Sequence, residues 1–241
     1  MVIQIFDNKE QVAKAGATLI AAQLIDEPES VLGFATGSSP VGIYQELIKL
    51  YEAGVITFAA TTSFNLDEYV GLDKKHEQSY FHFMQEHLFS KINLNPENIH
   101  IPDGMAEDLD EECERYESLL LQAGGIDLQL LGIGRNGHIG FNEPAAVMER
   151  FTHTVDLEAS TIEANARFFS SADEVPRRAL SMGISTIMEA GKIVLIATGE
   201  DKAEAVRAMI QGPISASCPA SVLQLHPAVT VLLDQESASL L

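Results

Sequence analysis

The sequence predicts an α/β protein whose mainly parallel sheet is covered by helices on both faces. Short apolar runs alternate along the chain with longer amphipathic runs, a pattern typical of parallel strands joined by helical crossovers. Several apolar runs end in segments rich in glycine and polar residues, as expected where a ligand binds beyond the carboxyl ends of parallel strands. No repeat, low-complexity linker or break in composition divides the sequence, so residues 1–241 are predicted to form a single domain.

The first half of the chain is predicted to alternate helices and apolar strands. We expect helices at Asn8–Leu24, Pro40–Ala53, Gln78–Phe89 and Glu107–Ala123. We expect strands at Ser30–Ala35, Thr61–Leu66, Ile99–Ile101 and Ile126–Leu131. Pro40 suits the first turn of its helix, for which Ser38 or Ser39 is the expected N-cap.

The second half is predicted to continue this alternation after a different middle segment. Residues 150–169 alternate apolar and polar side chains and can add antiparallel strands. We then expect a helix at Val175–Ala190, a strand at Lys192–Thr198, a helix at Asp201–Ile210, a short helix at Pro219–Leu225 and a closing strand at Ala228–Leu233.

The composition is that of a soluble globular protein and excludes some classes of partner. The 241 residues are 46% hydrophobic and 21% charged, and the formal net charge is −20 with 15 Lys and Arg. Because nucleic-acid phosphates require clustered Lys and Arg, no nucleic-acid partner is expected. An anionic small substrate would need a local positive site.

Cysteine usage and hydropathy predict a cytoplasmic chain without a membrane partner. Cys113 and Cys218 do not have the spacing of a metal site, and two cysteines suit a reduced chain better than a disulfide scaffold. The first ten residues include polar and acidic side chains, unlike a signal peptide. No apolar run approaches the length needed to span a bilayer.

The segment Leu131–Pro144 (LGIGRNGHIGFNEP) carries the strongest signal for chemistry. It follows an apolar strand and holds glycines around His138 and Glu143, and glycine allows the backbone to approach a ligand closely. Glu143 can orient the imidazole of His138 and stabilise its charged form. The alternative is a glycine-rich turn with a surface histidine and a solvated glutamate.

Two further strand ends suggest an anion site and a base. Thr36–Pro40 (TGSSP) leads from a strand into a helix, where free N–H groups and serine hydroxyls can bind a sugar phosphate, although it can also be a simple helix cap. No Lys-Ser/Thr pair follows, so this is not a nucleotide P-loop. Asp67 directly follows another strand and suits a general base, but an Asp-Glu pair there can also be a cap or a solvated turn.

Two cations are candidates for binding phosphate, and a metal site is not expected. Arg167 and Lys202 can each be an ordinary surface cation, but Lys202 begins a predicted helix, where a cation opposes the helix dipole unless an anion is bound. His82 and His87 do not share a helical face, so they are poor metal ligands. No serine or cysteine stands in a sequence context typical of the nucleophile of a catalytic triad.

Taken together, the segments TGSSP, NLDEYVGL, LGIGRNGHIGFNEP, EANARFF and TGEDKAEAV resemble the glucosamine-6-phosphate deaminase family along nearly the whole chain. The resemblance implies a Rossmann-like fold and the conversion of glucosamine 6-phosphate and water to fructose 6-phosphate and ammonia, without a metal or organic cofactor. It implies that Asp67 moves a proton between C2 and C1. It further implies that His138, assisted by Glu143, opens the sugar ring, and that the phosphate-binding residues are Gly37, Ser38, Ser39, Arg167 and Lys202.

The chain departs from the family pattern at Asn136 and after the NEP segment. Some members carry Asp in place of Asn136, which stands near His138 in the catalytic motif and adds no negative charge there. Allosteric members carry a basic cluster after NEP and a longer C-terminal tail, whereas this chain has Glu149, His153 and Val155 there and ends at Leu241. We therefore expect a non-allosteric monomer.

Two other functions compete with this interpretation. A 6-phosphogluconolactonase is similar in fold and in its Gly-His motif, but Tyr69 and Glu143 favour the deaminase. A sugar-phosphate sensor domain would accompany a DNA-binding segment, for which this chain has neither room nor basic charge. The polar segment after Val70 is expected to act as a lid.

Overall fold

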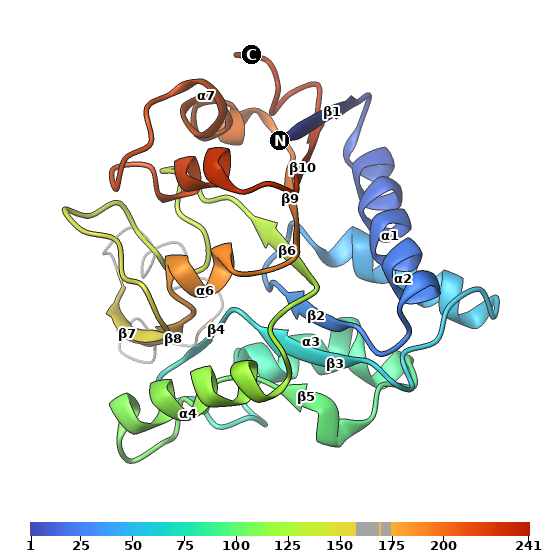
Figure 1. Ribbon diagram of the computed structural model, residues 1–241, viewed down its shortest axis with the longest axis vertical. Coiled ribbons are helices and arrows are strands. Elements are labelled where there is room, and N and C mark those ends of the chain that lie inside the picture. The colour runs from blue at the N-terminus through green and yellow to red at the C-terminus, as the bar shows by residue number, and fades with distance from the viewer. Residues whose placement is uncertain (158–168, 170–174) are drawn as a thin grey trace.

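A parallel seven-stranded sheet forms the centre of the computed structural model, which describes residues 1–157, 169 and 175–241 (Figure 1). Its strands are β1 (Val2–Phe6), β2 (Val31–Phe34), β3 (Thr62–Asn65), β5 (Ile99–His100), β6 (Leu128–Gly132), β9 (Lys192–Ala197) and β10 (Val229–Asp234). They lie in the order β1-β10-β9-β6-β2-β3-β5, and every neighbouring pair is parallel. The predicted α/β, Rossmann-like fold class is confirmed.

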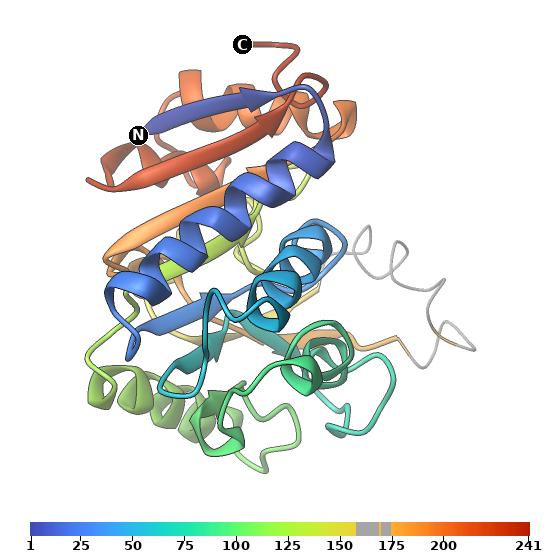
Figure 2. The same cartoon turned by 90° about the vertical axis from the view of Figure 1, so that its right-hand side faces the viewer.

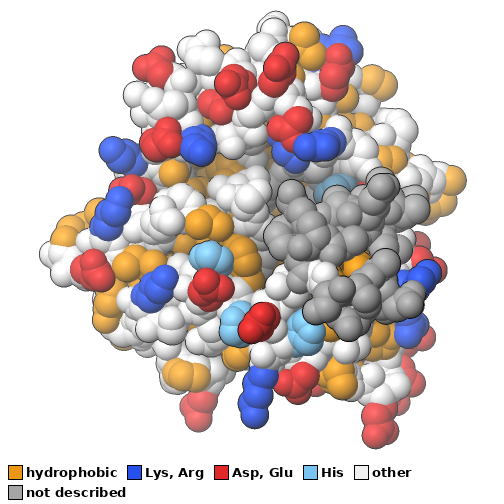
Figure 3. Space-filling model, turned by 180° about the vertical axis from the view of Figure 1, so that it is seen from behind, with side chains coloured by type: hydrophobic (Ala, Val, Ile, Leu, Met, Phe, Trp, Pro, Cys, Tyr) orange, Lys and Arg blue, Asp and Glu red, His pale blue; other side chains and the backbone are white. Residues whose placement is uncertain are grey.

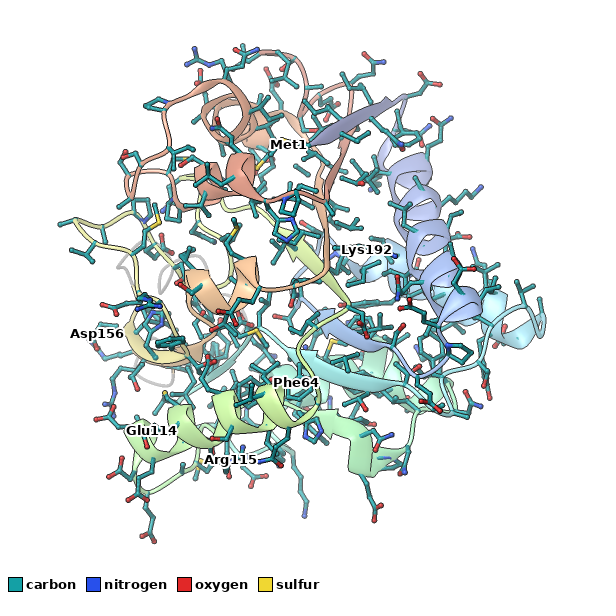
Figure 4. All side chains as sticks on the ribbon, in the orientation of Figure 1. Met1, Phe64, Glu114, Arg115, Asp156 and Lys192 are labelled. Carbon is teal, nitrogen blue, oxygen red and sulfur yellow. The ribbon has the colours of Figure 1, made fainter. Side chains whose placement is uncertain are left out.

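Helices cover both faces of this sheet. The helices are α1 (Lys9–Asp26), α2 (Val41–Glu52), α3 (Tyr80–His87), α4 (Leu109–Gln122), α6 (Ile184–Met188) and α7 (Ala203–Gln211). Figure 2 shows α1 and α2 on one face. Successive residues of β6 point to opposite faces, so Leu130 packs with the core on the α1–α2 side and Leu131 with the core on the α4 side. On the α4 side, Phe64 of β3 packs against Tyr116, with ring centroids 5.7 Å apart. Figure 4 labels Phe64, which lies between β3 and α4.

A smaller antiparallel sheet corrects one predicted helix. Its strands are β4 (Asp67–Tyr69), β8 (Arg178–Ser181) and β7 (His153–Asp156), in the order β4-β8-β7. The predicted helix Val175–Ala190 is wrong, because its first half is β8 and only α6 is helical. Hydrogen bonds to strands on both sides override the local helix propensity of Arg178–Ser181. Of the antiparallel strands predicted within residues 150–169, one is confirmed as β7, and residues 158–168 lie outside the described part of the chain.

Other differences are smaller. Helix α2 begins after Pro40 and no side chain caps it, so the predicted Ser38 or Ser39 cap is wrong; residues 38–40 form a turn instead. Pro219–Leu225 is a 3₁₀ helix, and the helix expected from Asp201 begins as the 3₁₀ turn Glu200–Lys202 before α7. Strand β1, an exposed edge strand, was not predicted, because its sequence VIQIF is short and does not alternate strictly between apolar and polar residues.

The strand order brings the four polar strand ends to one edge of the sheet. Strands β9, β6, β2 and β3 are consecutive neighbours and parallel. The chain passes from β2 to β3 and β5 on one side and then returns to β6 on the other side of β2. Such a reversal opens a crevice for ligands at the carboxyl ends of the strands. No helix among the described residues is long and apolar enough to cross a membrane.

Candidate active site

The loop Thr36–Pro40 joins β2 to the start of α2. Gly37 has a φ of +90°, and both Gly37 and Ser38 are exposed. Since no side chain caps α2, the N–H groups of its first turn remain available to an anion. Gly132, at the end of β6, lies against Ser39, because a Cβ on this glycine would be 3.9 Å from the Ser39 Cβ atom. The loop after β2 and the loop after β6 therefore begin side by side.

Lys202 belongs to a cluster of charges at the end of β9. Burial lowers the pKa of Lys202, and both Asp201 and Arg135 influence it electrostatically. Arg135 Nε lies 2.7 Å from Asp201 Oδ2, and this partner holds the pKa of Asp201 below its usual range. A half-buried lysine at a helix start agrees with the role expected for Lys202. The other candidate cation, Arg167, lies outside the described residues.

Asp67 is the first residue of β4 and is buried, with 7% of its surface exposed. Its Oδ1 atom has no hydrogen-bond partner among the described residues. Burial raises the pKa of Asp67 to about 8, and the neighbouring Glu68 carboxylate adds to this rise. A carboxylate with such a high proton affinity suits proton abstraction near neutral pH.

His138, Glu143 and Asn136 form a hydrogen-bonded group in the loop after β6. His138 Nδ1 lies 3.1 Å from Glu143 Oε1, and Asn136 Nδ2 donates to Glu143 Oε2 over 2.5 Å. The backbone N–H of His138 donates to Asn136 Oδ1 over 3.3 Å. Gly134 makes room for this group, because a Cβ there would lie 2.2 Å from the His138 ring. This arrangement can orient an imidazole and support its charged form.

Gly140 connects the His138 loop to Asp67. Its φ is +58°, and a Cβ there would lie 3.0 Å from Ser181 Oγ and 3.8 Å from Asp67 Oδ2. The Phe141 N–H donates to Ser181 Oγ over 3.0 Å, which holds the loop against β8. The tertiary structure thus brings the predicted base and the loop of the predicted His–Glu pair together.

An aromatic cluster beside Asp67 was missed by the sequence analysis. The rings of Tyr69 and Tyr80 lie 4.7 Å apart, and Tyr80 stacks on Phe141 with centroids 6.1 Å apart. The Tyr80 hydroxyl donates to the Tyr69 hydroxyl over 3.2 Å, and it lies near enough to Thr36 for that side chain to influence its pKa. Tyr80 thereby touches the loop after β2 as well as the loop after β6. The aromatic residues beside the two motifs were a signal, but their spacing alone did not predict a contact.

Charged side chains of both signs lie on the surface of the molecule. Figure 3 shows Asp and Glu side chains interspersed with Lys and Arg over the described part of one face. Among the described residues, no group of three or more His, Cys, Asp or Glu side chains is arranged to hold a metal ion.

The strand order and these side chains define a doubly wound α/β protein with a group of polar residues at the carboxyl edge of its sheet. Residues 7–232 match the family described as glucosamine-6-phosphate isomerases/6-phosphogluconolactonase, and the chain belongs to this family.

Curated relatives cover nearly the whole chain. The glucosamine-6-phosphate deaminase of Thermoanaerobacter pseudethanolicus is 53% identical over 234 residues, covering 97% of this chain and 92% of the relative. That of Halothermothrix orenii is 51% identical over 241 residues and covers 100% of both chains.

Solved structures show the same fold. A monomeric glucosamine-6-phosphate deaminase, described as a missing link of the NagB superfamily, superimposes with a TM-score of 0.97 at 46% identity and covers 100% of both chains. A 6-phosphogluconolactonase from Trypanosoma cruzi has a TM-score of 0.78 at 16% identity, covers 99% of this chain and 96% of its own, and shows likeness of fold only.

Proposed function

We propose that this chain is a glucosamine-6-phosphate deaminase, which converts glucosamine 6-phosphate and water to fructose 6-phosphate and ammonia. The observation that carries this proposal is the meeting at Gly140 of a buried, highly basic carboxylate and a loop holding a His–Glu pair. The names of relatives that are at least 51% identical over nearly the whole chain support it.

In the first step His138 opens the sugar ring. The imidazole takes the proton of the C1 hydroxyl and returns a proton to the ring oxygen, which exposes an aldehyde at C1. Glu143 holds the imidazole and stabilises its charged form, while Asn136 holds Glu143 in place. The aldehyde makes the proton on C2 acidic enough for the next step.

In the second step Asp67 moves that proton. Its carboxylate takes the proton from C2 and delivers it to C1, while the aldehyde oxygen gains a proton and the amine gives one up. C1 thereby becomes a CH2OH group, and C2 becomes the carbon of an imine. Water then adds to C2, and the resulting carbinolamine releases ammonia to leave the ketone of fructose 6-phosphate. The burial of Asp67 supports this role, because a desolvated carboxylate is a stronger base than one in water.

The phosphate group is proposed to bind at the ends of β2 and β9. The backbone of Gly37, the hydroxyls of Ser38 and Ser39, and the ammonium of Lys202 would hold it. Support comes from the uncapped start of α2 and the half-buried lysine. Arg167 is included on the family resemblance. Binding the phosphate far from the reacting carbons orients the sugar for the chemistry.

We further propose that the chain acts as a single domain and as a monomer in the cytoplasm, in amino-sugar catabolism, without a cofactor or an effector. The relative described as monomeric supports the oligomeric state. A single monomeric species on size-exclusion chromatography with light scattering is expected. Activation by N-acetylglucosamine 6-phosphate, or a hexamer, would contradict this proposal.

Ammonia release tests the function directly. Wild type given glucosamine 6-phosphate should release ammonia and fructose 6-phosphate in equal amounts, and Asp67→Asn should not. The same protein given 6-phosphogluconolactone should not accelerate its hydrolysis. Lactone hydrolysis without ammonia release would establish the lactonase alternative, and ligand binding with neither reaction would establish a sensor.

A further inference from the structure

Glu68 has a side-chain environment that the proposed mechanism does not use. It follows Asp67 in β4 and is 3% exposed. Its Oε1 atom accepts the N–H groups of Tyr69 at 2.8 Å and Tyr80 at 2.9 Å, and its Oε2 atom accepts that of Phe81 at 2.9 Å. Tyr80 and Phe81 are the first residues of α3. One buried carboxylate therefore joins the strand that carries the proposed base to the start of a helix.

The two neighbouring carboxylates differ in the hydrogen bonds that they accept. Three N–H groups and the nearby Lys74 favour the charged form of Glu68 and oppose the effect of its burial, whereas Asp67 Oδ1 accepts no hydrogen bond among the described residues. Burial still raises the pKa of Glu68, to about 7. Glu68 is therefore expected to ionise before Asp67, and its charge then disfavours a second negative charge beside it.

The other titratable groups coupled to Asp67 do not compete with this effect. Among the described residues, Tyr44 of α2, Tyr80 of α3 and Tyr116 of α4 interact with Asp67 electrostatically. Burial raises the pKa of each hydroxyl well above its usual value, so all three stay neutral over the working pH range. Lys74 acts on Glu68. Among residues 1–157, 169 and 175–241, the Glu68 carboxylate is thus the charged neighbour that acts on Asp67.

We propose that Glu68 is a positioning residue that holds the start of α3, and with it Tyr80, against β4, and that its buried charge makes Asp67 a stronger base. The kinetic consequence rests on the proposed function, in which Asp67 takes the proton from C2. The structural consequence concerns Tyr80, whose ring stacks on Phe141 and whose hydroxyl reaches Thr36.

The variant Glu68→Gln tests the charge, and Ser79→Ala is its matched control. Glutamine keeps the size and one acceptor oxygen but removes the charge. Ser79 caps the same helix, accepting the His82 N–H at 3.1 Å, so Ser79→Ala weakens the start of α3 without changing any charge near Asp67. In Glu68→Gln the acid limb of the kcat/KM profile should move about one pH unit lower, and kcat above that limb should fall because Asp67 is a weaker base. Ser79→Ala should leave the limb in place.

A second measurement does not depend on activity. The free energy of unfolding of Asp67→Asn is compared with that of wild type from pH 5 to pH 9, and the comparison is repeated in the Glu68→Gln background. The amount by which the free energy of unfolding of Asp67→Asn exceeds that of wild type should grow with pH. This difference should level off at the pH where Asp67 of the folded wild type is fully ionised. With Glu68→Gln present it should level off at a pH about one unit lower.

The outcomes separate this inference from the proposed function. If the stability difference between Asp67→Asn and its parent levels off at the same pH with Glu68 and with Glu68→Gln, the inference is overturned, even if ammonia is released normally. An acid limb that moves equally in Glu68→Gln and Ser79→Ala would also overturn it, because the helix start alone would then account for the effect. No ammonia release by wild type would contradict the proposed function, while the unfolding measurement would still decide the role of Glu68.

Discussion

Asp67 and the loop that carries His138, Glu143 and Asn136 meet at Gly140, but their side chains have different environments. Asp67 sits on a strand, is buried, and has an oxygen without a hydrogen-bond partner among the described residues. The side chain of His138 is 28% exposed, on a glycine-rich loop, and contacts a partner that is itself hydrogen-bonded. The environment of Asp67 is therefore set by burial, and that of the His138 ring by a carboxylate 3.1 Å from its Nδ1 atom.

This difference in environment matches the different requirements of the two proposed steps, proton transfer from carbon and ring opening. Taking a proton from carbon requires a strong base, and burial makes a carboxylate basic at the expense of folding stability. Moving protons between two oxygens of a sugar requires an imidazole that can gain and lose its charge readily, which a neighbouring carboxylate supports. Substitutions in the two regions should therefore have different signatures.

The largest effect is expected for Asp67→Asn. The amide keeps the shape of the side chain but cannot accept a proton from C2, so kcat should fall by about 10²–10⁴-fold, the usual contribution of a general base. Steady-state ammonia release with glucosamine 6-phosphate measures this. A variant with more than a tenth of the wild-type kcat would show that another group is the base.

A smaller loss is expected for Glu143→Gln. The amide preserves much of the hydrogen bonding but removes the charge that supports the His138 imidazolium, so kcat should fall by about 10–100-fold. The same assay measures it, with the exposed Glu149→Gln as a control that should behave as wild type. A loss as large as that of Asp67→Asn would weaken the distinction between the two regions.

The substitution expected to lose most activity, Asp67→Asn, should gain folding stability at high pH, and Glu143→Gln should not. The folded-state pKa of Asp67 is raised to about 8, so its contribution to stability is fully present below its unfolded value near 4 and is lost as the pH rises towards 8. Asp67→Asn should therefore be more stable than wild type at pH 9, by up to about 5 kcal/mol, because each pKa unit of the shift corresponds to about 1.4 kcal/mol, and should show little difference at pH 4. Denaturant unfolding at both pH values measures this. Glu143→Gln should show no such gain.

The smallest effect is expected for Asn136→Asp. A second carboxylate beside Glu143 would favour the charged imidazole of His138, and the limb of the pH–rate profile that belongs to ring opening should move upward by less than about one pH unit. A profile recorded from pH 5 to pH 9 tests this. An unmoved profile would show that residue 136 does not act through charge.

Most of the central sheet followed from local patterns, and the smaller sheet did not. Apolar runs such as Lys192–Ala197 could be predicted as strands, because a strand that is buried on both faces has a nearly continuous apolar sequence. Arg178–Ser181 has no such pattern, and it is a strand because β4 and β7 bond to its two edges. Residues far apart in the chain supply those bonds, so periodicity could not predict them.

For the candidate site, the sequence by itself determined which side chains stand at the strand ends, because glycine-rich and polar turns after apolar runs are local features. The roles of Asp67, His138 and Glu143 rest on that evidence and on the family resemblance, and they stay predictions. The tertiary structure alone decided that Gly140 meets Asp67, that Glu68 binds the start of α3, and that Tyr80 stacks on Phe141. These contacts depend on burial and on hydrogen bonds across long stretches of chain, and the free energy of such interactions is set only when the elements pack together.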